Sequence, residues 1–530
     1  MWPYSTYSKI NPVAEENFPF KKPRPDQLET ISQIIEAIDK GYKYIILEAG
    51  TGTGKSAIAY TLTSIYETSY ILTVTKQLQN QYLEDFSNFK LVKGRKNFSC
   101  KQYFNQNCSE GKCIVEGISC KNKSEDKIIC DYLRQKQTAL DSNKVISNYH
   151  YMFLELNYVG DFTKRDLLIL DEAHNLENTL MSQLKLEFSI SDLQKYLNVD
   201  IDDMILYELE NGDFDTWIQF INEIREKYSN ELSKLTEIDK TKVNEKISFI
   251  KQEIYDCSRF VENIAHDPYS WIFDYNEDLK TIEFKPLKID NYAKNTLFKY
   301  GDVCILMSAS ILDYKFFSKC LGLKENEVYP IRRKSPFDLK RNPIIAYDDF
   351  NLSHKNIKKT APKTINPIKS ILDKHKNEKG IIHTVSSSCK DYLMGNLEDY
   401  SLIDHDSENR QDRLWMFKNS DEPLVFISPS MGEGVNLPGD LCRFQIMYKL
   451  PYPDLADKQI RMRANADDEW YDYKTAMTLI QTYGRGMRYA EDYCTTYFID
   501  NRIKEFVKRD SKTNKFLPDS FVRAVLDGET

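Results

Sequence analysis

The residues best suited to chemistry form a glycine-rich loop near the start of the chain. The loop reads Ala49-Gly50-Thr51-Gly52-Thr53-Gly54-Lys55-Ser56 and follows the apolar run 44–48. Backbone N–H groups can surround a β-phosphate only when small residues line the turn, and three glycines meet that need. Lys55 would neutralise the β- and γ-phosphates, and the Ser56 hydroxyl would bind Mg²⁺. The whole loop from Gly50 to Ser56 therefore predicts a site for ATP and Mg²⁺, and we expect Ala49 to be tolerated where the strict pattern has glycine.

A second, acidic motif supports the same chemistry. Asp171-Glu172-Ala173-His174 follows the apolar run 167–170. A carboxylate at the C-terminal end of such a strand faces a bound nucleotide. We therefore expect Asp171 to hold Mg²⁺ and Glu172 to polarise the attacking water. A glycine-rich turn alone can arise by chance, but the acidic motif makes that interpretation weak.

Segments in the second half resemble the remaining motifs of superfamily 2 helicases and translocases. The segment 481–488 resembles the arginine-bearing motif that these enzymes direct across the cleft from their second domain. The resemblance implies that Gln481, Arg485 and Arg488 act at the γ-phosphate, where arginine fingers generally contribute about 10³ or more in rate. The segment 307–312 resembles the Ser-Ala-Thr motif, with Ser310 in place of threonine. The segment 428–439 resembles the fifth motif, in which Glu433 would lie between ATP and the nucleic acid.

Five cysteines lie between the glycine-rich loop and the acidic motif. They are Cys100, Cys108, Cys113, Cys120 and Cys130, whereas the other six are scattered singly. A disulfide framework needs an oxidising compartment, which nothing in the sequence indicates, so metal ligation is favoured. The spacing fits neither a zinc finger nor a ferredoxin run, and the residues alone leave zinc and iron open.

Composition restricts the class of protein. The 530 residues carry a net charge of −8, which by itself argues against a nucleic-acid partner. The charge is uneven, however, because 90–96 and Arg332-Arg333-Lys334 are basic, and a groove can be positive on an acidic protein. The chain lacks both a signal-peptide pattern and an apolar run of about 18 residues. We expect a soluble cytoplasmic protein without a membrane partner.

Short apolar runs alternate with helix-period segments in two sets. Continuous apolar runs of this kind belong to parallel sheets covered on both faces. Strands are expected at 44–49, 70–74, 144–147, 167–170 and 303–308 in the first set. They are expected at 343–347, 380–384, 424–428, 442–447 and 496–500 in the second set. The fold class predicted is α/β with two parallel-sheet domains, and the resemblance to superfamily 2 implies that both are RecA-like motor domains.

The first motor domain is expected to be interrupted twice. The expected divisions are 1–90 (motor domain 1), 91–135 (cysteine domain), 136–175 (motor domain 1), 176–298 (mostly helical insert), 299–330 (motor domain 1) and 331–530 (motor domain 2). We find no short internal repeat and no low-complexity tract.

The residues around the cysteines resemble those of the XPD and DinG helicases. The resemblance extends along nearly the whole chain. The segment 93–100 resembles the approach to their first cluster cysteine, and 130–132 with 148–151 resembles the path from their last one. The segment 20–27, ending at Gln27, resembles their adenine-reading segment. Ser335-Pro336-Phe337 resembles their domain junction, and 449–453 follows their fifth motif. The resemblance implies a 4Fe-4S cluster, a helical Arch insert and 5′-to-3′ movement on single-stranded DNA.

The family has four cluster ligands, whereas this segment offers five cysteines. The resemblance implies Cys100, Cys113, Cys120 and Cys130 as the ligands and Cys108 as the surplus cysteine, with Cys108 and Cys113 as the competing pair. Lys93, Arg95 and Lys96 could contact phosphates nearby, and Tyr103 and Phe104 could stack on bases. An aromatic pair is more often part of a core.

The function expected is an ATP-dependent 5′-to-3′ DNA helicase, a monomer that acts on single-stranded and forked DNA. A second hypothesis is a single-strand translocase that displaces proteins without unwinding duplexes. A third is a metal-bound DNA-binding adaptor with an inactive motor. The adaptor is disfavoured because the motor residues are intact, namely Lys55, Asp171, Glu172, Gln481, Arg485 and Arg488.

Overall fold

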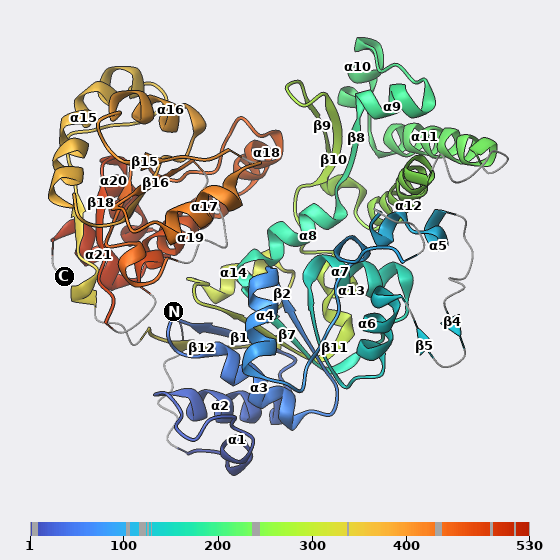
Figure 1. Cartoon of the computed structure of the whole chain (residues 1–530), viewed down its shortest axis with the longest axis horizontal. Helices are drawn as coiled ribbons and strands as arrows, with labels where there is room; N and C mark the ends of the chain where they lie inside the picture. The colour runs from blue at the N-terminus through green and yellow to red at the C-terminus, as the bar shows by residue number, and fades with distance from the viewer. Residues whose placement is uncertain are drawn as a thin grey trace.

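The computed structural model describes residues 2, 9–101, 106–115, 123–124, 127–128, 130–235, 244–335, 339–406, 408–429, 437–487, 491–513 and 516–528. Two sheet-containing motor domains lie side by side, and a largely helical insert stands above the first of them (Figure 1). In the described part of the chain, no helix is long and apolar enough to cross a membrane.

The first motor domain is built on a seven-stranded parallel sheet in the order β12-β1-β11-β7-β2-β6-β3. Its strands are β1 (Tyr44–Ala49), β2 (Ser69–Thr73), β3 (Lys90–Leu91), β6 (Lys144–Asn148), β7 (Arg165–Asp171), β11 (Gly301–Ser308) and β12 (Val328–Arg333). Its helices are α1 (Pro12–Glu16), α2 (Gln27–Asp39), α3 (Lys55–Ile65), α4 (Lys76–Asp85), α6 (Asp131–Leu140), α7 (Tyr149–Leu154), α13 (Ala293–Thr296) and α14 (Tyr314–Cys320). The strand β12 pairs with β1 up to Arg333, so this sheet continues three residues beyond the expected boundary at residue 330.

The second motor domain has a six-stranded parallel sheet in the order β13-β18-β17-β14-β16-β15. Its strands are β13 (Ile344–Ala346), β14 (Gly380–His383), β15 (Leu402–Ile403), β16 (Val425–Ser428), β17 (Phe444–Met447) and β18 (Thr495–Phe498). Its helices are α15 (Ile357–Lys374), α16 (Ser387–Asn396), α17 (Arg410–Asn419), α18 (Lys458–Ala466), α19 (Asp468–Tyr483), α20 (Arg502–Lys512) and α21 (Asp519–Leu526). The predicted α/β fold with two parallel sheets is confirmed.

The insert after the acidic motif combines helices with a small sheet. Its helices are α8 (Leu176–Leu184), α9 (Ile190–Leu197), α10 (Asp203–Asn211), α11 (Phe214–Leu235) and α12 (Asn244–Ile264). The antiparallel strands β8 (Leu186–Ser189), β10 (Thr281–Pro286) and β9 (Trp271–Asn276) form a three-stranded sheet that the sequence analysis did not predict. Phe284 on β10 packs against Trp217 and Phe260 from the two long helices, and this aromatic cluster joins sheet and helices.

The cysteine segment lies between β3 and α6 and touches the helical insert. Its described elements include α5 (Lys112–Val115) and the short strands β4 (Lys123–Ser124) and β5 (Lys127–Ile128). From α12, the Ser248 hydroxyl donates to the Ser109 carbonyl at 3.1 Å, and Lys251 Nζ donates to the Ile114 carbonyl at 2.8 Å. The two insertions are therefore in direct contact.

We predict that Gly380→Ala destabilises the second motor domain. A β-carbon at Gly380 in β14 would stand 2.4 Å from the Phe444 ring on β17, and overpacking of this kind costs about 1–3 kcal/mol. Calorimetry of the intact protein should show the melting temperature of that domain lowered by about 2–4 °C per kcal/mol. Gly395→Ala in α16 is the matched control because no atom lies within 4 Å of its added β-carbon. Equal melting temperatures for the two variants would contradict the prediction.

Candidate active site

The glycine-rich loop connects β1 to α3 at the carboxyl edge of the first sheet. Gly52 and Gly54 have φ angles of 86° and 79°, a region that residues with a β-carbon rarely adopt. The Thr53 hydroxyl donates to the Gly50 carbonyl at 2.8 Å, and Lys55 Nζ donates to the Ala49 carbonyl at 3.2 Å. The loop thus has the small residues, the turn and the lysine that a phosphate cradle needs.

Gln27 lies directly against this loop. Its Nε2 donates to the carbonyls of Thr53 at 3.0 Å and Gly54 at 3.2 Å, while its Oε1 accepts from the Arg24 backbone N–H at 2.7 Å. Arg24 Nη1 also donates to the Gly52 carbonyl at 2.8 Å. The structure therefore places the expected adenine-reading segment at the phosphate loop, although Arg24 itself was not among the predicted site residues.

Asp171 ends β7 beside the loop and is almost fully buried. Its carboxylate accepts from the Tyr82 hydroxyl at 3.0 Å and from the Glu172 backbone N–H at 2.9 Å. Burial and the neighbouring Glu172 carboxylate raise the pKa of Asp171 to about 6. The Tyr82 hydroxyl also interacts with the Ser56 hydroxyl, so one tyrosine links the two expected Mg²⁺ ligands. These oxygen donors fit Mg²⁺, which usually takes one or two protein ligands beside phosphate oxygens.

His174 connects Glu172 to the Ser-Ala-Ser segment. Its Nδ1 lies 3.3 Å from Glu172 Oε2 and 2.7 Å from the Ser308 hydroxyl, which donates to the Ser310 carbonyl at 3.1 Å. Burial lowers the pKa of His174 to about 4. The Glu172 carboxylate acts to raise this pKa, whereas the positive charges of nearby lysines and an arginine lower it further. Glu172 itself has φ = 55°, a strained conformation of the kind that clusters at active sites.

Glu48 is a site residue that the sequence analysis missed. It lies on β1 and is 5% exposed, with one carboxylate oxygen accepting from the backbone N–H groups of Ile311 and Leu312 at 2.6 Å each. The other oxygen pairs with Arg332 Nε at 2.5 Å. Leu312 has φ = 67°, so the carboxylate holds a strained turn next to the Ser-Ala-Ser segment. An acidic residue inside an otherwise apolar strand was the available signal.

The second motor domain brings Arg485 to the acidic motif. Arg485 lies in the short turn after α19, is 9% exposed, and its charge helps to lower the pKa of His174, as do those of Lys55 and Lys474. Gln481 Nε2 is buried and has no hydrogen-bond partner among the described residues. A buried polar group of this kind is consistent with a role in ligand binding. The expected site residues Arg488 and Glu433 lie outside the described residues.

The cysteine segment gathers thiols around Arg95. Arg95 Nη1 lies 3.7 Å from Cys113 Sγ and 4.0 Å from Cys108 Sγ, and the guanidinium stacks 4.4 Å from the centre of the Tyr132 ring. Arg95 is therefore turned towards sulfur, and its additional contact with phosphates stays a prediction. The expected ligand Cys120 lies outside the described residues, as do Tyr103 and Phe104.

Cys108, which we expected to be surplus, lies within the group of thiols. Its Sγ is 4.0 Å from Cys130 Sγ, and burial together with Cys130 raises the pKa of Cys108 to about 12. The Cys100 sulfur lies beside Gly111 in the same segment. In the described ranges, no group of three or more His, Cys, Asp or Glu side chains has the arrangement of a metal site. The thiols suit a soft metal, and the described geometry does not select four of them.

Comparison with known proteins agrees with this geometry. Residues 20–199 match the family described as type III restriction enzyme, res subunit, and residues 371–520 match the helicase C-terminal domain family. The chain is 23% identical to the probable ATP-dependent helicase MJ0942 of Methanocaldococcus jannaschii, covering 97% of each chain. It is 22% identical to the ATP-dependent DNA helicase YoaA of Escherichia coli, covering 91% of this chain and 92% of that protein. A solved XPD helicase superposes with a TM-score of 0.67 at 16% identity, covering 93% of this chain and 99% of that one.

Two motor domains with a phosphate loop, an acidic motif and an arginine turn define an ATP-hydrolysing helicase of superfamily 2. Within that superfamily the chain is similar in sequence to the helicase YoaA and in fold to the XPD helicase. ATP and Mg²⁺ are accordingly its cofactors.

We predict that Lys55→Ala lowers the kcat of ATP hydrolysis by about 10²-fold or more, because it removes the charge facing the β- and γ-phosphates. Phosphate release at saturating ATP and single-stranded DNA measures the effect. Lys164→Ala is the control. Lys164 forms an exposed ion pair with Asp302 at the start of β7, whereas Asp171 and the phosphate loop lie at its other end. Undiminished hydrolysis by Lys55→Ala would contradict the assignment of the loop.

Proposed function

We propose that this protein is an ATP-dependent DNA helicase that moves 5′ to 3′ along single-stranded DNA. The observation that carries the proposal is the contact between α12 and the cysteine segment through Ser248 and Lys251. Two insertions that meet beside one motor domain can frame a passage for a single strand and a wedge for a fork. The naming of YoaA as a DNA helicase supports DNA as the nucleic acid.

The proposed hydrolysis uses residues of both motor domains. Lys55, Ser56 and Asp171 bind the phosphates and Mg²⁺, and Glu172 polarises water. Gln481, Arg485 and Arg488 stabilise charge on the γ-phosphate from the second domain. Gln27 reads the adenine, and Glu433 lies between ATP and the DNA. The acting form is a monomer that binds single-stranded and forked DNA.

We further propose that four cysteines, Cys100, Cys113, Cys120 and Cys130, hold a 4Fe-4S cluster. The thiols around Arg95 support a soft-metal site in this segment. When bound, the cluster supplies folding free energy to a segment whose described elements are short. Arg95 offsets thiolate charge from its position over Tyr132.

The polarity predicts a specific result in a strand-displacement assay. ATP-dependent displacement should occur from a duplex with a 5′ single-stranded tail and not from one with a 3′ tail, and Lys55→Ala should abolish it. Gel separation of the strands over time measures both substrates. Displacement from the 3′ tail alone would reverse the polarity. DNA-stimulated hydrolysis without displacement would favour the translocase, and activity unchanged in Lys55→Ala would favour the adaptor.

The ligand set predicts the iron content of single Cys→Ser variants. Variants at Cys100, Cys113, Cys120 and Cys130 should lose most of their iron, together with the broad absorption at roughly 400 nm of an iron–sulfur cluster. Cys108→Ser should keep both signals, and Cys257→Ser in α12 is the control for a buried thiol. Iron and sulfide assays on anaerobically purified protein give the readout. Loss of iron from Cys108→Ser with retention in Cys120→Ser would assign Cys108 as a ligand.

A further inference from the structure

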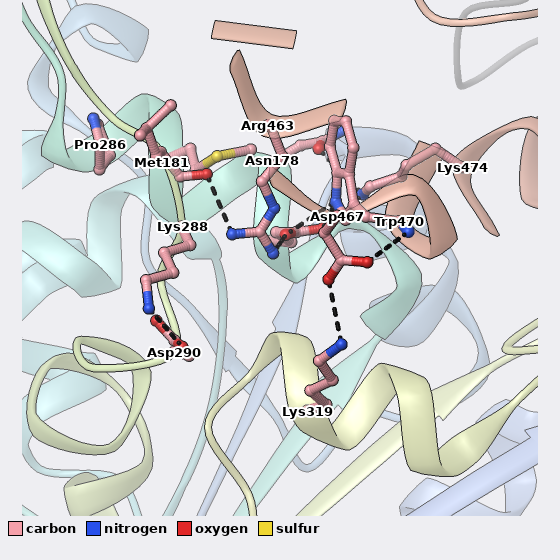
Figure 2. Close-up of polar contacts among 12 residues, drawn as sticks. Asn178, Met181, Pro286, Lys288, Asp290, Lys319, Arg463, Asp467, Trp470 and Lys474 are labelled. Atoms are coloured by element: carbon pink, nitrogen blue, oxygen red, sulfur yellow. Dashed lines mark hydrogen bonds and ion pairs between the residues drawn. The ribbon is translucent and has the colours of Figure 1, made fainter. Parts of the chain in front are cut away.

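One buried carboxylate at the start of the helical insert is held by the helical hairpin α18–α19 of the second motor domain. Glu177, on the first turn of α8, is 4% exposed. Lys474 Nζ lies 2.8 Å from its Oε2, and the Trp470 indole N–H donates to both carboxylate oxygens at 3.2 Å. Arg463 Nη2 lies 3.5 Å away on the other oxygen. Figure 2 shows Arg463, Trp470 and Lys474 facing Asn178 and Met181 of α8.

The buried Glu177 carboxylate needs these partners to stay ionised. Burial alone would raise the pKa of Glu177, but the charges of Lys474 and Arg463 outweigh it and hold the pKa below its ordinary value. The carboxylate is therefore ionised where water is excluded. A buried charge that loses one partner is strongly unfavourable, so movement of α19 away from α8 would leave Glu177 uncompensated.

Further contacts surround this buried ion pair. The Tyr473 hydroxyl of α19 donates to the Ile311 carbonyl at 2.8 Å, next to the turn that Glu48 holds. The Tyr473 ring also packs on Phe316 of α14 with ring centres 4.8 Å apart. On the exposed rim, Lys319 pairs with Asp467 at 3.1 Å. The hairpin is thus seated on α8 of the insert by a buried ion pair, and on the first motor domain by the hydrogen bond and the ring contact of Tyr473.

The two helices joined by this interaction, α8 and α19, are each connected to a part of the ATP site. The helix α8 begins directly after the acidic motif at Asp171 and Glu172, and α19 runs straight into the turn that carries Arg485. Lys474 and Arg485 both act electrostatically on His174, so the seated helix has its arginine turn near the acidic motif.

We propose that Glu177 is a positioning residue for ATP hydrolysis. By binding Lys474 and Trp470, it seats α19 so that Arg485 reaches the γ-phosphate, without itself touching ATP. This inference rests on the assignment of Arg485 to the cleft made above. Because the phosphate loop and Gln27 lie elsewhere, loss of Glu177 should affect turnover and leave ATP binding largely intact.

The test compares Glu177→Gln and Lys474→Met with wild-type protein in steady-state ATP hydrolysis on single-stranded DNA. We expect kcat to fall at least fivefold in each variant while the KM for ATP changes less than twofold. The double variant should be no slower than the slower single one, since both remove the same interaction. Glu210→Gln is the matched control, because Glu210 also joins the insert to α18, through Lys458 at 2.5 Å, but is half exposed.

Several results would overturn the proposal. They are wild-type kcat in both Glu177→Gln and Lys474→Met, a change confined to the KM, or losses that simply add in the double variant. A loss of kcat in Glu177→Gln matched by a lower melting temperature, with Lys474→Met folded and fully active, would also count against it. The variant Arg485→Ala separates the role of Arg485 from that of Glu177. Full hydrolysis by Arg485→Ala would show that Arg485 is not an arginine finger, whatever the Glu177 variants show.

Discussion

The arrangement of the motor depends on how carboxylates are buried in the first motor domain and at the start of its insert. Glu48, Asp171 and Glu177 are each at most 5% exposed, and a buried carboxylate is stable only when donors from other segments satisfy it. Glu48 takes its donors from the segment after β11, Asp171 from α4, and Glu177 from the second domain. Each acid therefore fixes the distance between two parts of the chain that are remote in sequence.

The local parts of this arrangement were predictable from the sequence. The glycines and Lys55 predicted the turn between β1 and α3, and apolar runs predicted the strands that flank it, because both signals are read over a few neighbouring residues. The partners of Glu48 and Glu177 were not predictable, because they are remote in the sequence. Those of Glu48, for example, are more than 260 positions away. Tyr82 was missed for the same reason: nothing near it in sequence indicates Asp171.

The small sheet of the insert shows a different limit. Trp271–Asn276 and Thr281–Pro286 contain the aromatic and β-branched residues of a hairpin around a polar turn, so a signal was present. It was obscured because long, charged, helix-period segments dominate the surrounding region. For the cysteines, the resemblance of flanking residues could suggest ligands, but whether Cys108 packs against Cys130 depends on the path of the chain between them. Spacing alone does not determine that path.

The short helix α7 explains how the cysteine segment is joined to the ATP site. At its first residue, the Tyr149 hydroxyl donates to the Asp171 carbonyl at 2.8 Å. Two residues later, the Tyr151 hydroxyl lies 3.2 Å from that of Tyr132, on which Arg95 stacks. Both contacts start from the first turn of α7, so the backbone of Asp171, the proposed Mg²⁺ ligand, and the residues beside the thiols are supported by the same short helix. A rearrangement at Asp171 that moved α7 would therefore move the cysteine segment as well.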